Sequence, residues 1–210
     1  MSSDEPTLPE SIAEELLRAG FDEAPEYAEL VQRCLLASDP RHRMLALRAA
    51  VRRGVMTIPD WSRAIADQSR DVRREALQLV AYEPNPGHSI LGAVVAALDD
   101  PDPLVTEGAA FALGELQHRA AVLTLCRVAS EHEDARCREA AVGALGALGD
   151  EGGRATIVAA LEDKAPIRRR AIVALANFEG PDIDAALARA REDRDWQVRA
   201  AVNQLGRDED

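Results

Sequence analysis

Apolar and polar positions follow a helical period in segments that recur about every 31 residues. In the stronger copies, apolar or small residues occupy offsets 0, 3, 4, 7, 8 and 11 from an opening position. At about 100° per residue these offsets fall on one stripe, which predicts an amphipathic helix. The opening positions are Val72, Val105, Cys137, Ile167 and Val198, and a weaker copy begins near His42.

A shorter apolar stripe precedes each of these helices, for example Leu91, Val94, Val95 and Leu98. A fixed period of this length is typical of a solenoid, in which each helix pair buries its apolar face against the next pair. We therefore expect an all-α fold, an α-α superhelix of about six helix pairs. The predicted pairs cover residues 25–54, 58–83, 88–116, 119–148, 154–178 and 182–206.

The two ends of the chain differ from the repeats. Residues 1–24 form an acidic N-terminal segment, in which residues 9–19 predict an extra helix that caps the first pair, and residues 207–210 form an acidic tail. Residues 1–30 carry a net charge of −8 and residues 206–210 a charge of −2, out of −12 for the whole chain. The acidity therefore belongs to the ends and does not predict an acidic groove.

Each predicted pair has an Asp in its central turn and, in most copies, an Arg near the start of its second helix. This pattern resembles the HEAT repeat, in the short-repeat group that includes phycobilin-lyase-like proteins. The residues that carry the resemblance are D-P-D-P-L-V-T-E-G-A-A-F-A-L-G, from Asp100 to Gly114, and the copies of this segment.

The resemblance implies a structural ladder, in which each Asp caps a helix and each Arg bridges to a neighbouring repeat. Thr106 replaces the Arg in the third copy, so the ladder is expected to be weak or interrupted there. The implied ladder residues are Asp39, Arg43, Asp71, Arg73, Asp134, Arg138, Asp163, Arg168, Asp195 and Arg199.

Composition and motifs indicate no catalytic chemistry. The sequence has no nucleophile elbow, P-loop or dinucleotide-binding motif. Its one adjacent His–Glu pair is His132–Glu133, and the other histidines lie in separate repeats, so we expect no metal site and no cofactor. No apolar run approaches the roughly 20 residues of a membrane span. We expect a non-enzymatic, cytoplasmic protein that is a monomer in isolation.

A partner surface is predicted from the second helices, whose offsets 2 and 6 point away from the core. Phe111 is notable there because only 3% of the residues are aromatic, and Gly143 follows it along the same column. The pair could form an anchor pocket; alternatively, Phe111 covers its own repeat. The candidate binding residues are Phe111, Gly143, Val173, Arg48, Arg74, Glu107, Glu139 and Arg169.

These features favour a noncatalytic scaffold or adaptor that binds a protein partner through the groove lined by the second helices. The resemblance suggests an alternative, an accessory subunit of a chromophore- or cofactor-attachment lyase. A third hypothesis is a nucleic-acid-binding array using Arg41–Arg53, where five arginines occur among thirteen residues without an acid. The repeat body, however, carries a charge of only −2, and phosphate binding needs a net basic surface.

Overall fold

The computed structural model describes residues 10–22 and 24–205, and within these ranges it contains thirteen α-helices, three short 3-10 helices and no strand. The expected acidic tail, residues 207–210, and the first nine residues lie outside the described part of the chain. The described residues form two compact units. One extends to Val80 and includes Asn85–Ala93, and the other consists of Ala81–Pro84 and the chain from Val94 onward.

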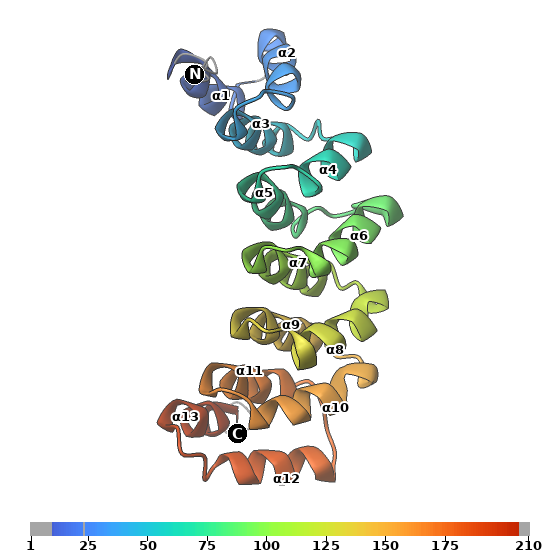
Figure 1. The fold of residues 1–210 in the computed structure, drawn as a ribbon, viewed down its shortest axis with the longest axis vertical. Coiled ribbons are helices and arrows are strands. Elements are labelled where there is room, and N and C mark those ends of the chain that lie inside the picture. Colours follow the sequence, from blue (N-terminus) through green and yellow to red (C-terminus); the bar gives the residue numbers. More distant parts are fainter. Residues whose placement is uncertain (1–9, 23, 206–210) are drawn as a thin grey trace, which may run out of the picture. The chain divides into compact units, whose positions relative to one another are not determined.

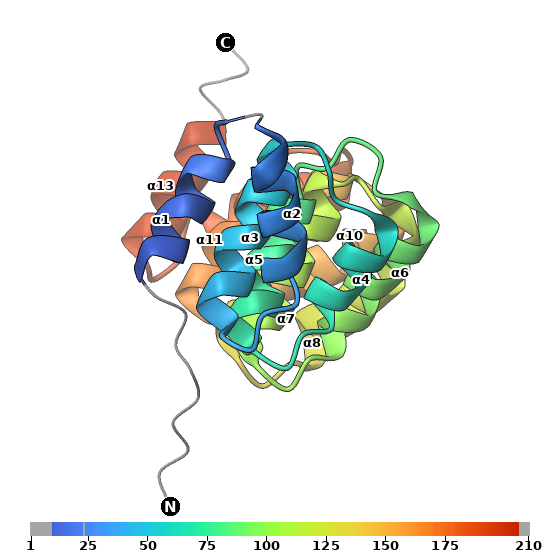
Figure 2. The ribbon, with the colours of Figure 1, turned by 90° about the horizontal axis from the view of Figure 1, so that it is seen from above.

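The first unit is built around α3 and α5. Helices α1 and α2 both pack against α3, α3 packs against α5, and α4 also packs against α5 (Figure 2). Leu16 and Ala19 on α1 are fully buried, so this helix contributes to the core of the unit. The helices are α1 (Glu10–Ala19), α2 (Pro25–Cys34), α3 (Pro40–Arg52), α4 (Ile58–Ile65) and α5 (Arg70–Val80), followed by α6 (Gly87–Ala96), which begins in this unit and ends in the second.

The second unit stacks its helices in two rows (Figure 1). One row, whose helices we call the inner helices, is α7 (Pro103–Glu115), α9 (Ala135–Leu148), α11 (Ala165–Leu175) and α13 (Trp196–Leu205), each packed against the next. The other row contains α8 (Val122–Glu131), α10 (Glu151–Ala159) and α12 (Pro181–Ala190). Three 3-10 helices, η1 (Ala97–Asp99), η2 (Arg119–Ala121) and η3 (Ala160–Glu162), lie at helix ends.

The apolar stripe of the sequence is the buried face of the inner helices. In the second unit, Val105, Cys137, Ile167 and Val198 are each at most 1% exposed. Burying an aliphatic side chain of this size contributes about 1.5–3 kcal/mol. The repeated stripe therefore accounts for the all-α repeat solenoid fold.

Recurrent aspartates begin the second helix of several pairs. The carboxylates of Asp39, Asp102 and Asp134 accept hydrogen bonds of 2.8–2.9 Å from the backbone N–H two residues later. Each satisfies a donor that the helix itself leaves without a partner, which is worth about 0.5–2 kcal/mol. Pro40 and Pro103 follow two of these caps at the first helical position, where a missing N–H costs nothing.

Glycines set the spacing between the inner helices of the second unit. A Cβ on Gly114 would lie 3.1 Å from the Cα of Ala144, and a Cβ on Gly146 would lie 2.5 Å from the Cβ of Ala174. The backbones of α7 and α9, and of α9 and α11, therefore approach more closely at these points than larger residues allow.

Candidate functional site

Arginine forks link successive repeats through paired hydrogen bonds. Arg43 binds both carboxylate oxygens of Asp67 at 2.8 and 2.7 Å through Nε and Nη2. Arg138 binds Asp163 at 2.7 and 2.9 Å, and Arg168 binds Asp193 at 2.8 and 2.7 Å, in the same manner. The Nη1 atom of each arginine donates to a carbonyl of its own turn. This fork geometry fixes each turn to the next.

The structure divides the aspartates of the implied ladder into two sets. Asp39, Asp134 and Asp195 are helix caps, three residues before the opening position. The carboxylates that receive the arginine forks lie one or two residues earlier in the turn; Asp163 is one, and Asp67 and Asp193 were not in the predicted set. Asp71 lies in the first turn of α5, where its exposed carboxylate is 3.9 Å from Arg70.

Two further ladder arginines, Arg73 and Arg199, make the same bond to their own turns. Arg73 donates through Nη1 to the carbonyl of Asp67 at 2.8 Å, and Arg199 donates through Nη1 to the carbonyl of Asp193 at 2.6 Å. Both arginines therefore have the same orientation toward their turns as Arg43, Arg138 and Arg168.

The third copy lacks an arginine fork because both partners differ. Thr106 is fully buried, and its hydroxyl donates to the carbonyl of Asp100 at 3.3 Å. His132 stands at the carboxylate position of the next repeat, and its Nδ1 accepts from the backbone N–H of Asp134. Gln117 bridges these repeats instead, donating to the carbonyls of Gly114 and Ala147 at 3.0 Å.

The ladder makes stability sensitive to acid. Hydrogen bonds from Arg138 and Arg168 lower the pKa values of Asp163 and Asp193, respectively, below the ordinary value. A carboxyl whose pKa is lower in the folded state stabilises the fold above its unfolded pKa, about 3.9, and loses that contribution as pH falls through the lowered value. We expect the melting temperature to fall steeply below about pH 4. For Asp193→Asn, the melting temperature at neutral pH should be lower than that of the wild type, and it should fall less as the pH is lowered. A pH dependence of the melting temperature equal to that of the wild type would contradict a stabilising role of the Asp193 carboxylate.

The inner helices of the second unit border a depression of about 320 Å³ between α11 and α13. Two large apolar side chains are exposed there, Val173 at 50% and Trp196 at 67%. Three predicted binding residues line it, namely Glu139, Arg169 and Val173, and the structure adds residues from α13. The complete lining is Glu139, Arg169, Arg170, Val173, Trp196, Gln197, Ala200, Ala201 and Gln204, which we call the α11–α13 groove.

Basic groups border this groove. Arg169 donates through Nη1 to the amide oxygen of Gln197 at 2.9 Å, and Arg170 lies 3.9 Å from a carboxylate oxygen of Glu139. The Arg170 side chain also lies beside Gly143, where an added Cβ would be 3.2 Å from its Cδ. The backbone of Gly143 is therefore next to a long side chain.

Phe111 and Glu107 lie on α7, outside the lining of the α11–α13 groove. The Phe111 ring is 44% exposed and makes an edge contact with Tyr82, with 6.4 Å between centroids and an interplanar angle of 63°. Tyr82 is itself 70% exposed. Trp196 and Tyr82 were absent from the predicted set, although the scarcity of aromatic residues would have been a signal for both.

The remaining predicted binding residues, Arg48 and Arg74, belong to the first unit. Arg48 forms a two-bond fork with Glu75, at 2.6 and 2.8 Å, and this contact raises the arginine pKa. Arg74 lies exposed on α5. Among the other arginines of residues 41–53, Arg52 stacks on the Phe21 ring at 4.5 Å and Arg53 donates to the carbonyls of Ala19 and Asp22.

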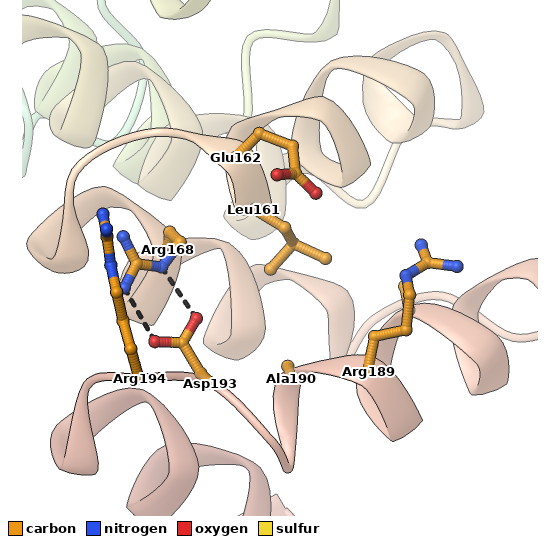
Figure 3. A pocket seen from close by; sticks show the side chains of 8 residues that line it. Leu161, Glu162, Arg168, Arg189, Ala190, Asp193 and Arg194 are labelled. Carbon is orange, nitrogen blue, oxygen red and sulfur yellow. Dashed lines mark hydrogen bonds and ion pairs between the residues drawn. The ribbon is translucent and has the colours of Figure 1, made fainter.

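A second depression of the second unit, about 430 Å³, lies beside the Arg168–Asp193 fork (Figure 3). Leu161 and Ala190 form apolar parts of its wall, and Arg189 and Arg194 border it. The fork uses both oxygens of Asp193, so this carboxylate is engaged in holding the repeats together.

In residues 10–22 and 24–205, no group of three or more His, Cys, Asp or Glu side chains is arranged to hold a metal ion. None of the helices described there is both long enough and apolar enough to cross a membrane.

The paired helices, aspartate caps and arginine forks define an α-helical repeat protein. A family described as HEAT repeats matches residues 91–176 and 122–206, which together make up more than half of the chain. The chain belongs to the HEAT repeat family. No curated protein matches its sequence.

Solved structures share the fold at low sequence identity. YibA of E. coli is 13% identical, with a TM-score of 0.62 and coverage of 95% of this chain and 75% of that one. The CpcE–CpcF complex of phycocyanin lyase from Nostoc sp. PCC7120 is 19% identical, with a TM-score of 0.60 and coverage of 96% and 77%. A designed armadillo repeat protein in complex with the peptide (KR)4 is 14% identical, with a TM-score of 0.56 and coverage of 93% and 98%.

Proposed function

We propose that the protein is a noncatalytic scaffold that binds a protein partner through the inner helices of its second unit, at the α11–α13 groove. The main support is the exposure of Trp196 and Val173 on either side of a depression with a polar rim. Exposed aromatic and aliphatic anchors in a concave site are characteristic of binding surfaces. The structural neighbour that holds the peptide (KR)4 uses a similar fold, which supports a peptide-like partner.

The proposal predicts that a charge in the groove abolishes binding and leaves the fold intact. Val173→Asp places a carboxylate in the apolar wall, and its cost in stability is small because the side chain is half exposed. Tagged wild-type protein should capture a partner from the lysate of its own organism, and Val173→Asp should lose it. Phe111→Asp tests whether the contact extends to α7.

Leu123→Asp is the matched control, since Leu123 is an 80% exposed aliphatic residue on α8 and is absent from the groove lining. This variant should retain the partner. Circular dichroism should give all three variants the helical content of the wild type. If Val173→Asp retains the partner as well as the wild type does and Leu123→Asp loses it, the binding surface lies on α8 and the proposal is overturned.

A second candidate function is an accessory role in chromophore attachment, favoured by the likeness to the phycocyanin lyase complex. That role requires a bound tetrapyrrole or a subunit that carries one. Titration with a free bilin should then produce a visible absorbance change and raise the melting temperature. A scaffold for other partners would show neither effect.

A further inference from the structure

The lining of the α11–α13 groove has a net positive charge, with two arginines and one glutamate. Three arginines elsewhere in the second unit, Arg127, Arg138 and Arg154, are each 2.5–2.7 Å from a carboxylate oxygen. Among the described residues, Arg169 instead donates to the neutral amide oxygen of Gln197. A guanidinium with a neutral acceptor keeps its charge and further donors for a carboxylate.

The second guanidinium at the rim is weakly paired. Arg170 is 3.9 Å from Glu139, which is too long for a hydrogen bond, and its side chain is 49% exposed. Glu139 is the one acidic residue in the groove lining, against two arginines. The rim therefore favours a ligand that brings carboxylates.

The centre of the groove is apolar. Val173, Trp196, Ala200 and Ala201 present aliphatic and aromatic surface, and the depression of about 320 Å³ can enclose a large side chain and the adjoining backbone. The exposed Trp196 ring supplies a flat contact of the kind that dominates binding energy at interfaces.

The helix spacing favours an extended ligand. Packed helices lie about 8–10 Å apart, and alternate residues of an extended chain lie about 7 Å apart, so the two spacings are similar. A peptide crossing from α11 to α13 can thus place one apolar side chain in the centre and a carboxylate at the rim within two residues. Gln197 and Gln204 carry amide groups at the rim that can bind its backbone.

We propose that the α11–α13 groove takes an extended acidic segment of a partner protein, in which a bulky apolar residue has carboxylates within two residues on either side. This assignment rests on the proposed function and specifies the partner chemistry of the same site. Trp196 and Val173 bind the apolar residue, and Arg169 and Arg170 bind the carboxylates.

Trp196 provides the readout, because it is exposed while the other tryptophan, Trp61, is 2% exposed. The probe is the blocked peptide Gly-Glu-Leu-Glu-Glu-Leu-Gly, with a matched peptide in which each Glu is Lys. The acidic peptide should shift the Trp196 emission to shorter wavelength in a saturable way. Its affinity should be at least about tenfold higher than that of the basic peptide, and added salt should lower this affinity. Trp196→Leu should remove the shift.

Arg169→Gln should lower the affinity for the acidic peptide by about fivefold or more, because a charge-assisted hydrogen bond to the peptide is lost. Arg127→Gln removes the same charge from α8, outside the groove lining, and should leave the affinity for the acidic peptide within about twofold. Equal losses in both variants would indicate nonspecific attraction and overturn the inference. Equal or tighter binding of the basic peptide would also overturn it, while keeping the groove as a binding site.

Absence of any Trp196 response to the acidic peptide likewise contradicts the assigned chemistry. The proposed function is judged separately, by whether Val173→Asp loses a partner that Leu123→Asp retains. The two failures are therefore distinguishable.

Discussion

Replacement of Leu145 by alanine is expected to lower the free energy of unfolding by about 2–5 kcal/mol. Leu145 lies on α9 and is 1% exposed. Its side chain packs toward α10, where a Cβ on Gly153 would be 3.0 Å from Cδ2 of Leu145. Truncation removes this packing and leaves a cavity that rigid neighbouring helices fill only in part.

Urea unfolding followed by circular dichroism measures the effect of this change. Leu123→Ala is the control, because its 80% exposed side chain should change stability by no more than about 0.5 kcal/mol. Similar losses for the two variants would mean that the stripe containing Leu145 is not the core of the second unit.

Replacement of Gly146 by alanine is expected to destabilise the protein by about 1–3 kcal/mol, although alanine is the better helix former. The new Cβ would lie 2.5 Å from the Cβ and 2.7 Å from the Cα of Ala174. These atoms belong to the helix itself and cannot rotate away, so α9 and α11 must separate. The hydrogen bond from Asn177 to the Gly146 carbonyl, 2.8 Å, would be disturbed as well.

Gly143, three residues earlier on the same helix, supplies the matched control. Its added Cβ would meet the flexible side chain of Arg170 at 3.2 Å, which can move. We expect Gly143→Ala to be neutral or to stabilise the protein by up to about 1 kcal/mol. Unfolding measurements that rank the two variants in the opposite order would refute the close approach of α9 and α11 at Gly146.

The fold was predictable because the repeat supplies the same signal several times. The offsets that begin at Val105, Cys137 and Ile167 specify a helix face, and the recurring turn aspartate specifies where the helix begins. One copy of this pattern is ambiguous, but five in register leave a solenoid as the consistent solution.

Residue type and spacing did not predict which turn aspartates cap a helix and which accept an arginine fork. Asp67 lies in the turn before α5 and Asp71 lies in the first helical turn of α5, and only the three-dimensional path shows that Asp67 faces the fork of Arg43. The roles of the helical glycines were hidden for the same reason. Both Gly143 and Gly146 are glycines within α9, yet a Cβ on Gly143 would meet the flexible side chain of Arg170, whereas a Cβ on Gly146 would meet the Cβ and backbone of Ala174.

The groove was partly predictable. Offsets 2 and 6 identified Val173, Arg169 and Glu139, because a helical period determines which side chains leave the core. Trp196 precedes the stripe of α13, and its place in the groove depends on how α13 packs against α11. Packing of this kind is a tertiary property that no single helix encodes.

Site-specific crosslinking is the most direct measurement of the binding surface. A photoreactive phenylalanine analogue would replace Gln204 at the groove rim, or Leu123 on α8, in otherwise identical proteins. We expect a crosslink to the captured partner from position 204 and none from position 123. A crosslink from position 123 alone would show that the partner binds elsewhere and would contradict binding at the α11–α13 groove.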